Sequence, residues 1–170
     1  PSRSVMRQHQ HKVVAPVSLV VSAFAPVQDV RRTLTPQLRT DIHDTRLVLV
    51  DLGAGRDRLG GSCLAQVYGH VGRDAPDCDD AQRVRRFFEA IGRLRGEDLV
   101  LAYHDRSDGG LFVTLAEMAF AGQCGVDVEL PVSGSAAIVG ALFAEELGAV
   151  VQVRTTDVER VQQVLQDCSL

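Results

Sequence analysis

The fold is decided by residues 99–121, which read LVLAYHDRSDGGLFVTLAEMAFA. The apolar run from Leu99 to Ala102 predicts a strand, and the amphipathic run from Leu111 to Ala121 predicts a helix. Between them lie histidine, aspartate, arginine and serine side chains and two glycines. Amides at a helix start attract anions and a carboxylate can hold Mg²⁺, so this pattern is typical of a metal–phosphate site. The stretch predicts a strand–loop–helix unit with a candidate site in its loop.

The same loop also has a structural explanation. Asp108 is a candidate cap for the following helix, and Gly109 and Gly110 relieve strain in the turn. The density of charge between two apolar elements favours a functional role instead, because Asp105 and Ser107 can face one ligand. From the residues alone, both interpretations remain open.

A second helix start lies at Gly60-Gly61-Ser62, ahead of a helix expected to reach Tyr68. These residues either line a ligand site or form a tight entry into a packed helix. Cys63 follows directly, but the local pattern lacks the oxyanion-holding elbow that a glutaminase nucleophile needs, so we do not expect Cys63 to be catalytic.

The other elements are predicted from periodicity and turn residues. Strands are expected over residues 17–25, 47–52, 126–130 and 149–153, and helices over residues 29–38, 79–95, 135–147 and from 156 or 157 onward. Asp29 is the candidate cap of the helix over residues 29–38. The continuous apolar run of residues 47–52 is typical of an interior strand, and Phe88 is expected on the buried face of its helix. This order predicts a sheet covered by helices in one domain, residues 16–170, after a poorly ordered lead-in of residues 1–15.

Composition excludes several classes of protein. The 170 residues are 45% hydrophobic and 24% charged, with a net charge of −4, so nothing favours binding to nucleic acid or to an anionic membrane. No apolar run is long enough to cross a membrane. The four cysteines form no CxxC pair, which favours reduced thiols in a cytoplasmic protein over disulfides or zinc.

Residues 103–122, YHDRSDGGLFVTLAEMAFAG, closely resemble a signature stretch of the phosphoribosylformylglycinamidine synthase family. The similarity continues in order through most of the chain, from about Val17 to Val153. The further matching stretches are residues 19–25, 35–38, 59–62, 64–68 and 145–150.

The resemblance implies a fold. The chain is similar to the second C-terminal-type synthetase domain of the large single-chain enzyme, a fold shared with aminoimidazole ribonucleotide synthetase. That implies an α+β, three-layer α/β/α sandwich with a mixed sheet and partial ferredoxin-like topology. The final strand of such domains is expected beyond Leu170, so we expect a fragment of a longer enzyme.

The resemblance also implies a function. The family converts formylglycinamide ribonucleotide to formylglycinamidine ribonucleotide in de novo purine biosynthesis, with glutamine and ATP. It implies that Asp105 binds Mg²⁺, that Ser107 contacts ATP or ADP, and that Gly109 and Gly110 approach the nucleotide. No catalytic residue is expected in this chain, and the nucleotide is either consumed or structural.

The implied partners are the other domains of the parent synthase, including its glutaminase, together with the nucleotide and the small ribonucleotide substrate. We expect the isolated fragment to be inactive. Two alternatives are a non-catalytic docking module that forms a homodimer, and a related ATP-dependent synthetase such as aminoimidazole ribonucleotide synthetase.

Overall fold

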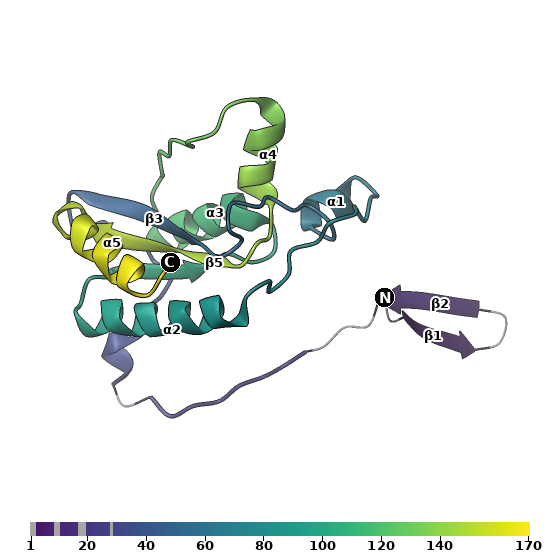
Figure 1. Ribbon diagram of the computed structural model, residues 1–170, viewed down its shortest axis with the longest axis horizontal. Coiled ribbons are helices and arrows are strands. Elements are labelled where there is room, and N and C mark those ends of the chain that lie inside the picture. Colours follow the sequence, from purple (N-terminus) through teal and green to yellow (C-terminus); the bar gives the residue numbers. More distant parts are fainter. Residues whose placement is uncertain (1–2, 9–10, 17–19, 28) are drawn as a thin grey trace. The chain divides into compact units, whose positions relative to one another are not determined.

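The computed structural model (Figure 1) describes residues 3–8, 11–16, 20–27 and 29–170. The chain divides after Thr33 into two units, the second running from Leu34 to Leu170. The second unit therefore starts later than the expected domain start at residue 16.

The first unit contains a β-hairpin. Strands β1 (Arg3–Gln8) and β2 (His11–Pro16) pair antiparallel, with Gln8 opposite His11. The described part of residues 1–15 is thus a hairpin rather than the poorly ordered lead-in expected from its polar composition.

The strand predicted over residues 17–25 is not formed in its described part. Residues 17–19 lie outside the described residues, and residues 20–25 are exposed and have no regular structure. In place of the helix predicted over residues 29–38, the structure has the 3₁₀ turn η1 (Val30–Arg32). The Asp29 carboxylate accepts a hydrogen bond from the amide of Arg31 at 3.1 Å. The capping role predicted for Asp29 is confirmed.

The second unit is built on a three-stranded sheet. Its strands are β3 (Thr45–Asp51), β4 (Ala102–Asp105) and β5 (Gly148–Arg154), in the order β3-β5-β4. Both pairings are antiparallel, so among the described residues the sheet is not mixed as expected. The expectation that residues 47–52 form an interior strand is also wrong. β3 is an edge strand, and the central strand is β5, which is buried from Gly148 to Val153.

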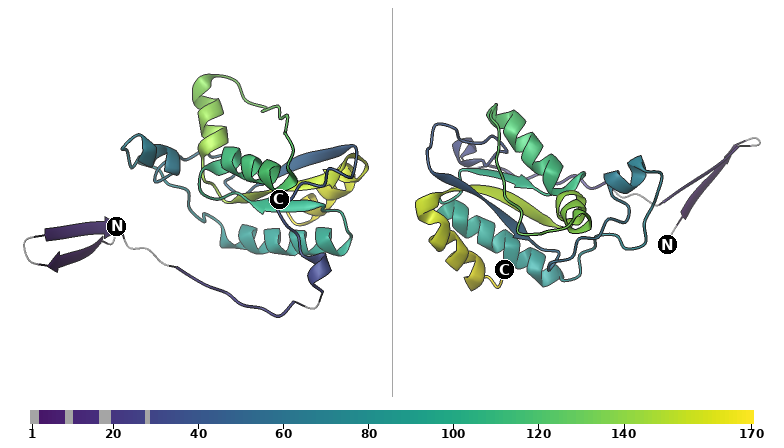
Figure 2. Two further views of the ribbon diagram at one scale, coloured as in Figure 1. Left: turned by 180° about the vertical axis from the view of Figure 1, so that it is seen from behind. Right: turned by 90° about the horizontal axis from the view of Figure 1, so that it is seen from above.

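Helices cover both faces of this sheet, as Figure 1 shows. Alternate side chains of β5 point to opposite faces, so Val151 packs with α2 (Ala81–Gly96) and α5 (Val158–Asp167), and Val150 packs with α3 (Gly110–Gly122). Figure 2 shows α2 and α5 side by side. The predicted α+β class and the helices over residues 79–95, 111–121 and after Asp157 are confirmed.

Three local predictions are wrong. Phe88 is 79% exposed, because Ala90 and Leu94 carry the buried face of α2. Residues 126–130 form no strand. The helix predicted over residues 135–147 is α4 (Ser135–Phe143), and the chain becomes extended at Ala144.

The remaining elements are short. Helix α1 spans Cys63–Val67, and the 3₁₀ turn η2 spans Thr155–Asp157 ahead of α5. In the part of the chain that the structure describes, no helix has the length and apolar character required to cross a membrane.

Candidate functional site

The candidate site lies where β4 passes into α3. His104 and Asp105 are the last two residues of β4, and Gly110 is the first residue of α3. The strand begins later than the apolar run suggested, so these two polar residues are part of the sheet. The amide of Arg106 donates to the carbonyl of Gly148 at 2.8 Å, which continues the β4–β5 ladder into the loop.

Asp105 and Ser107 lie at the surface of this loop. The Asp105 side chain is 69% exposed, and Ser107 is exposed as well. An exposed carboxylate at a strand end offers hard oxygen ligands, the type that Mg²⁺ prefers. These two residues therefore have the accessibility that the predicted metal and nucleotide roles require.

His104 lies next to Asp105, and its ring contacts Glu117 of α3. Its Nε2 is 2.7 Å from Oε2 of Glu117, and its side chain is 14% exposed. Its Nδ1 is 3.7 Å from Oδ1 of Asp105 and makes no hydrogen bond within the described residues. His104 is thus a packed neighbour of the candidate metal ligand.

Arg106 anchors the loop from inside. Its side chain is 3% exposed. Nε donates to the carbonyl of Glu146 at 2.6 Å, and Nη2 donates to the Asp51 carboxylate and to the carbonyl of Leu147. Burial alone raises the pKa of Asp51, but hydrogen bonds from the Gly55 amide and from Arg106 outweigh burial and hold that pKa below its ordinary value. The arginine joins the ends of all three strands.

Gly109 and Gly110 form the tight turn into α3. Both have positive φ, +81° and +67°, a region that L side chains rarely adopt. A Cβ on Gly110 would lie 2.8 Å from the carbonyl oxygens of Leu142 and Ala144. The turn chemistry proposed as the structural explanation is therefore present.

The amides of both glycines already have acceptors inside the chain. Gly110 donates to the carbonyl of Ser107 at 3.0 Å, and Gly109 donates to Oε1 of Glu145 at 2.8 Å. Helix α3 has no side-chain cap from its own N-terminal residue, and Asp108 does not act as one. The carboxylate that accepts a hydrogen bond at the start of α3 is that of Glu145, 36 residues further along the chain.

Glu145 also reaches the start of α1. The same Oε1 accepts a hydrogen bond from the amide of Cys63 at 2.8 Å. The Cys63 thiol and the carboxylates of Asp108 and Glu145 present ligand atoms within 4.8 Å of one another. Burial, then the hydrogen bond and charge of Glu145, raise the pKa of the Cys63 thiol. A raised pKa opposes nucleophilic reactivity of this thiol.

The neighbouring Glu146 is fully buried and paired. The Arg58 side chain donates to the Glu146 carboxylate from Nε at 2.6 Å and from Nη2 at 2.7 Å. The backbone amide of Arg58 donates to the same carboxylate at 3.1 Å. That hydrogen bonding raises the pKa of Arg58 above its ordinary value. This buried pair fixes the segment 53–58 against the start of β5.

At Gly60-Gly61-Ser62 the structural interpretation is supported. The Ser62 hydroxyl donates to the carbonyl of Leu59 at 2.7 Å and accepts from the amide of Ala65 at 3.2 Å. A Cβ on Gly60 would lie 2.5 Å from the carbonyl oxygen of Asp74. These contacts describe a capped, tightly packed helix entry.

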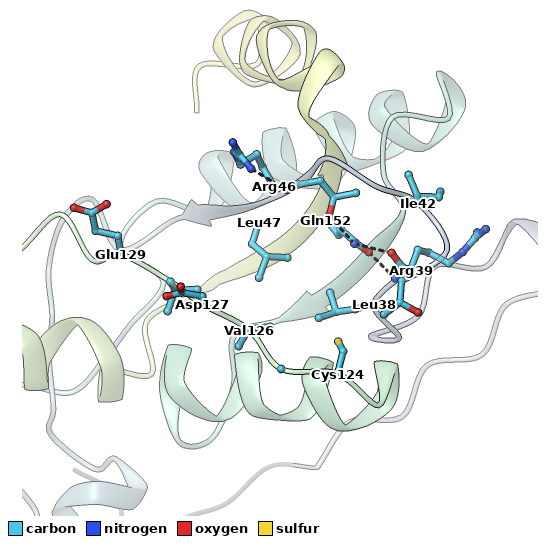
Figure 3. A pocket seen from close by; sticks show the side chains of 14 residues that line it. Leu38, Arg39, Ile42, Arg46, Leu47, Cys124, Val126, Asp127, Glu129 and Gln152 are labelled. Carbon is cyan, nitrogen blue, oxygen red and sulfur yellow. Dashed lines mark hydrogen bonds between the residues drawn. The ribbon is translucent and has the colours of Figure 1, made fainter.

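A hollow of about 540 Å³ lies elsewhere, between the start of β3 and residues 124–129 (Figure 3). Its wall includes Leu38, Leu47 and Val126, and the Gln152 side chain hydrogen-bonds both backbone groups of Arg39. Residues 126–129 line this hollow together with the start of β3 and do not pair with β3 as a fourth strand. It includes none of the predicted site residues.

Sequence reasoning missed Glu145, the internal role of Arg106 and the Arg58–Glu146 pair. The one available signal is the acidic pair Glu145-Glu146 beside the apolar residues 147–151. Carboxylates next to a buried strand need partners, but the sequence alone does not say which.

Comparison with known proteins agrees with this architecture. The model of one protein family, described as AIR synthase related protein, C-terminal domain, matches residues 45–170, from the first residue of β3 to the end of the chain. Domains of this family occur in ATP-dependent synthetases related to aminoimidazole ribonucleotide synthetase. Since the match covers most of the chain, including the β4–α3 loop, the chain belongs to the family of C-terminal domains of AIR synthase related proteins.

Proposed function

We propose that this chain is a synthetase domain of a phosphoribosylformylglycinamidine synthase and that its β4–α3 loop contributes to a Mg²⁺–nucleotide site. The observation that carries the proposal is the position of Asp105 and Ser107. Both are exposed on a loop anchored by the buried Arg106, within a domain of an ATP-dependent synthetase family. The ordered similarity of about Val17 to Val153 to that enzyme family supports the choice within it.

The donor set fits a hard cation and a phosphorylated ligand. Asp105 would hold Mg²⁺ through its carboxylate, and the Ser107 hydroxyl would contact ATP or ADP. Because the Gly109 amide is already bonded to Glu145, we assign Gly109 and Gly110 to shaping the loop rather than to donating these amides to phosphate. When bound, Mg²⁺ neutralises phosphate charge.

The parent reaction is the ATP- and glutamine-dependent amidation of formylglycinamide ribonucleotide. In it, ATP activates the carbonyl oxygen of the glycinamide amide by phosphorylation, and ammonia released from glutamine then displaces the phosphate to give the amidine. The ribonucleotide site and the glutaminase belong to other domains in this proposal. The nucleotide held here is either the one consumed or a structural one.

The direct test is calorimetric titration of the 170-residue chain with ADP and with ATP, each with and without Mg²⁺. We expect Mg²⁺-dependent binding that weakens about tenfold in Asp105→Asn, because the variant loses a charged metal ligand. Glu89→Gln is the matched control, since it removes an exposed carboxylate on α2 that pairs with Arg85. Equal affinity of the Asp105→Asn variant and the unmodified chain would remove Asp105 from the ligand set.

A second test concerns activity. We expect no glutamine-dependent turnover of formylglycinamide ribonucleotide by the purified chain. The proposal assigns the glutaminase that releases ammonia, and the ribonucleotide site, to other domains. Turnover by the chain alone would contradict this division of labour. Turnover of a different ribonucleotide would favour the alternative, a related ATP-dependent synthetase.

One observation favours a docking role for the same domain. Phe112 and Phe120, both on α3, are 52% and 78% exposed, and large exposed apolar side chains on one element are typical of surfaces that meet another domain or a second copy. Light scattering over a range of concentrations tests the homodimer. A constant monomer mass at high concentration counts against it.

A further inference from the structure

The starts of α1 and α3 share one acceptor. Oε1 of Glu145 accepts from the amide of Cys63 and from the amide of Gly109, each at 2.8 Å. Cys63 is the first residue of α1, and Gly109 immediately precedes α3. A single carboxylate oxygen thus links two helix entries that lie 82 and 36 residues away from it in sequence.

The loop that carries Asp105 and Ser107 is fixed at both ends. At its beginning, the Arg106 amide bonds to Gly148, and the Arg106 side chain is buried against the start of β5. At its end, the Gly110 amide donates to the Ser107 carbonyl, inside the loop, and the Gly109 amide donates to Glu145. Of these two, only the bond to Glu145 ties the end of the loop to another part of the fold.

Glu145 is well suited to this task because its own position is fixed. It lies between Ala144 and Glu146, both fully buried, and Glu146 is held by Arg58. A hydrogen bond to an ionised acceptor is stronger than one between neutral groups, and a carboxylate at a helix start is favoured by the helix dipole. The carboxylate can therefore hold the loop without taking part in ligand binding itself.

We propose that Glu145 is a positioning residue of the nucleotide site. It fixes the Ser107–Gly110 turn through the Gly109 amide, and so sets the placement of the Asp105 carboxylate and the Ser107 hydroxyl. This inference rests on the proposed nucleotide function. Residues that orient ligand groups in this way commonly change metal affinity by about 10- to 100-fold when they are removed.

The test compares Glu145→Ala with Glu145→Gln in the full chain. Alanine removes the acceptor, and we expect the dissociation constant of Mg²⁺–ADP to rise about tenfold. Glutamine keeps an acceptor oxygen of the same reach, and we expect it to restore most of the affinity. Glu89→Ala, on an exposed part of α2, is the control for loss of a carboxylate. Thermal unfolding of each variant verifies that it is folded.

A second readout needs no nucleotide. Hydrogen exchange of the Gly109 amide should be faster in Glu145→Ala than in the unmodified chain, and close to normal in Glu145→Gln. If Glu145 only stabilised the fold, Glu145→Ala would lower the melting temperature, but Glu145→Gln would not restore the affinity for Mg²⁺–ADP. If alanine does not fold, Glu145→Gln and the exchange measurement still decide the question. Affinity and Gly109 protection that change together support the proposal, whereas lost affinity with Gly109 protection kept, or normal affinity without that protection, would overturn it.

The remaining outcomes separate this inference from the proposed function. If the unmodified chain binds no Mg²⁺–nucleotide, both are wrong. If it binds and Glu145→Ala binds equally well, only the role of Glu145 is wrong. Tighter binding by both variants would also overturn the proposal, because it would mean that the carboxylate competes with phosphate for the Gly109 amide.

Discussion

A pair of glycines lies at the start of both α1 and α3, but the first turns of the two helices are closed in different ways. At α1 a local cap adds to the contact with Glu145, since the Ser62 hydroxyl accepts a hydrogen bond from the Ala65 amide, three residues along. At α3 the preceding glycine has no side chain to offer, and the acceptor is Glu145. A local cap stabilises its own helix, whereas a distant cap makes the start of the helix depend on the rest of the fold.

The same contrast applies to what each entry exposes. The Ser62 side chain is fully buried, and the entry to α1 is tightly packed. The entry to α3 is equally well anchored, by Arg106, yet it leaves Asp105 and Ser107 at the surface. An anchored loop with exposed polar side chains is suited to binding a ligand, because those side chains lose less freedom when the ligand arrives.

The largest effect is expected from breaking the anchor beside α3. Arg106→Gln removes a buried guanidinium that donates to the Asp51 carboxylate and to the carbonyls of Glu146 and Leu147. We expect a loss of about 3 kcal/mol in the free energy of unfolding, measured by urea denaturation. Arg85→Gln, which breaks only an exposed pair with Glu89, should change stability little. Similar effects of the two variants would contradict the anchoring role.

The two glycine pairs provide the next test. At Gly61 an added Cβ meets nothing within 4 Å, but φ is +74°, so Gly61→Ala should cost about 1 to 2 kcal/mol from strain alone. At Gly110 the Cβ also contacts backbone oxygens at 2.8 Å, and we expect about 3 kcal/mol. Thermal unfolding of the two variants measures the difference. An equal loss would show that the close approach at Gly110 relaxes.

A smaller effect is expected from the local cap. Ser62→Ala removes the acceptor for Ala65 and the donor to Leu59, and loss of such a cap typically costs about 1 kcal/mol. We also expect Mg²⁺–nucleotide affinity to stay the same, because the loss is confined to α1. Weaker nucleotide binding in this variant would mean that the two helix entries are coupled beyond their shared contact with Glu145.

The smallest effect concerns the thiol at the start of α1. The pKa of Cys63 is raised by burial and by Glu145, so its neutral form is favoured in the folded chain and its thiolate is scarce at pH 8. Alkylation at pH 8 should therefore be slower at Cys63 than at the exposed Cys78, and should accelerate in Glu145→Gln. Mass spectrometry of the labelled peptides measures both rates, and rapid labelling of Cys63 would contradict the raised pKa.

Several elements could be predicted because their causes are local. The apolar periodicity of residues 81–96 and 158–167, the cap at Asp29 and the strand–loop–helix order at residues 99–121 all depend on neighbouring residues. Predictions failed where long-range contacts decide. The alternation of residues 126–130 is typical of a strand, but a strand needs a partner, and residues 126–129 line a hollow with the start of β3 instead of pairing with it. Phe88 has the spacing of a core residue, but the buried face of α2 is carried by Ala90 and Leu94.

For the loop at residues 103–110, the sequence by itself determined the residue types, the position between a strand and a helix, and the choice of Asp105 and Ser107 as candidate ligand contacts. Only the tertiary structure decided that Arg106 points inward and that the Gly109 amide is bonded to Glu145 rather than left available to an anion. The reason is physical: hydrogen bonds between residues 36 to 82 positions apart form only after the sheet has brought those segments together.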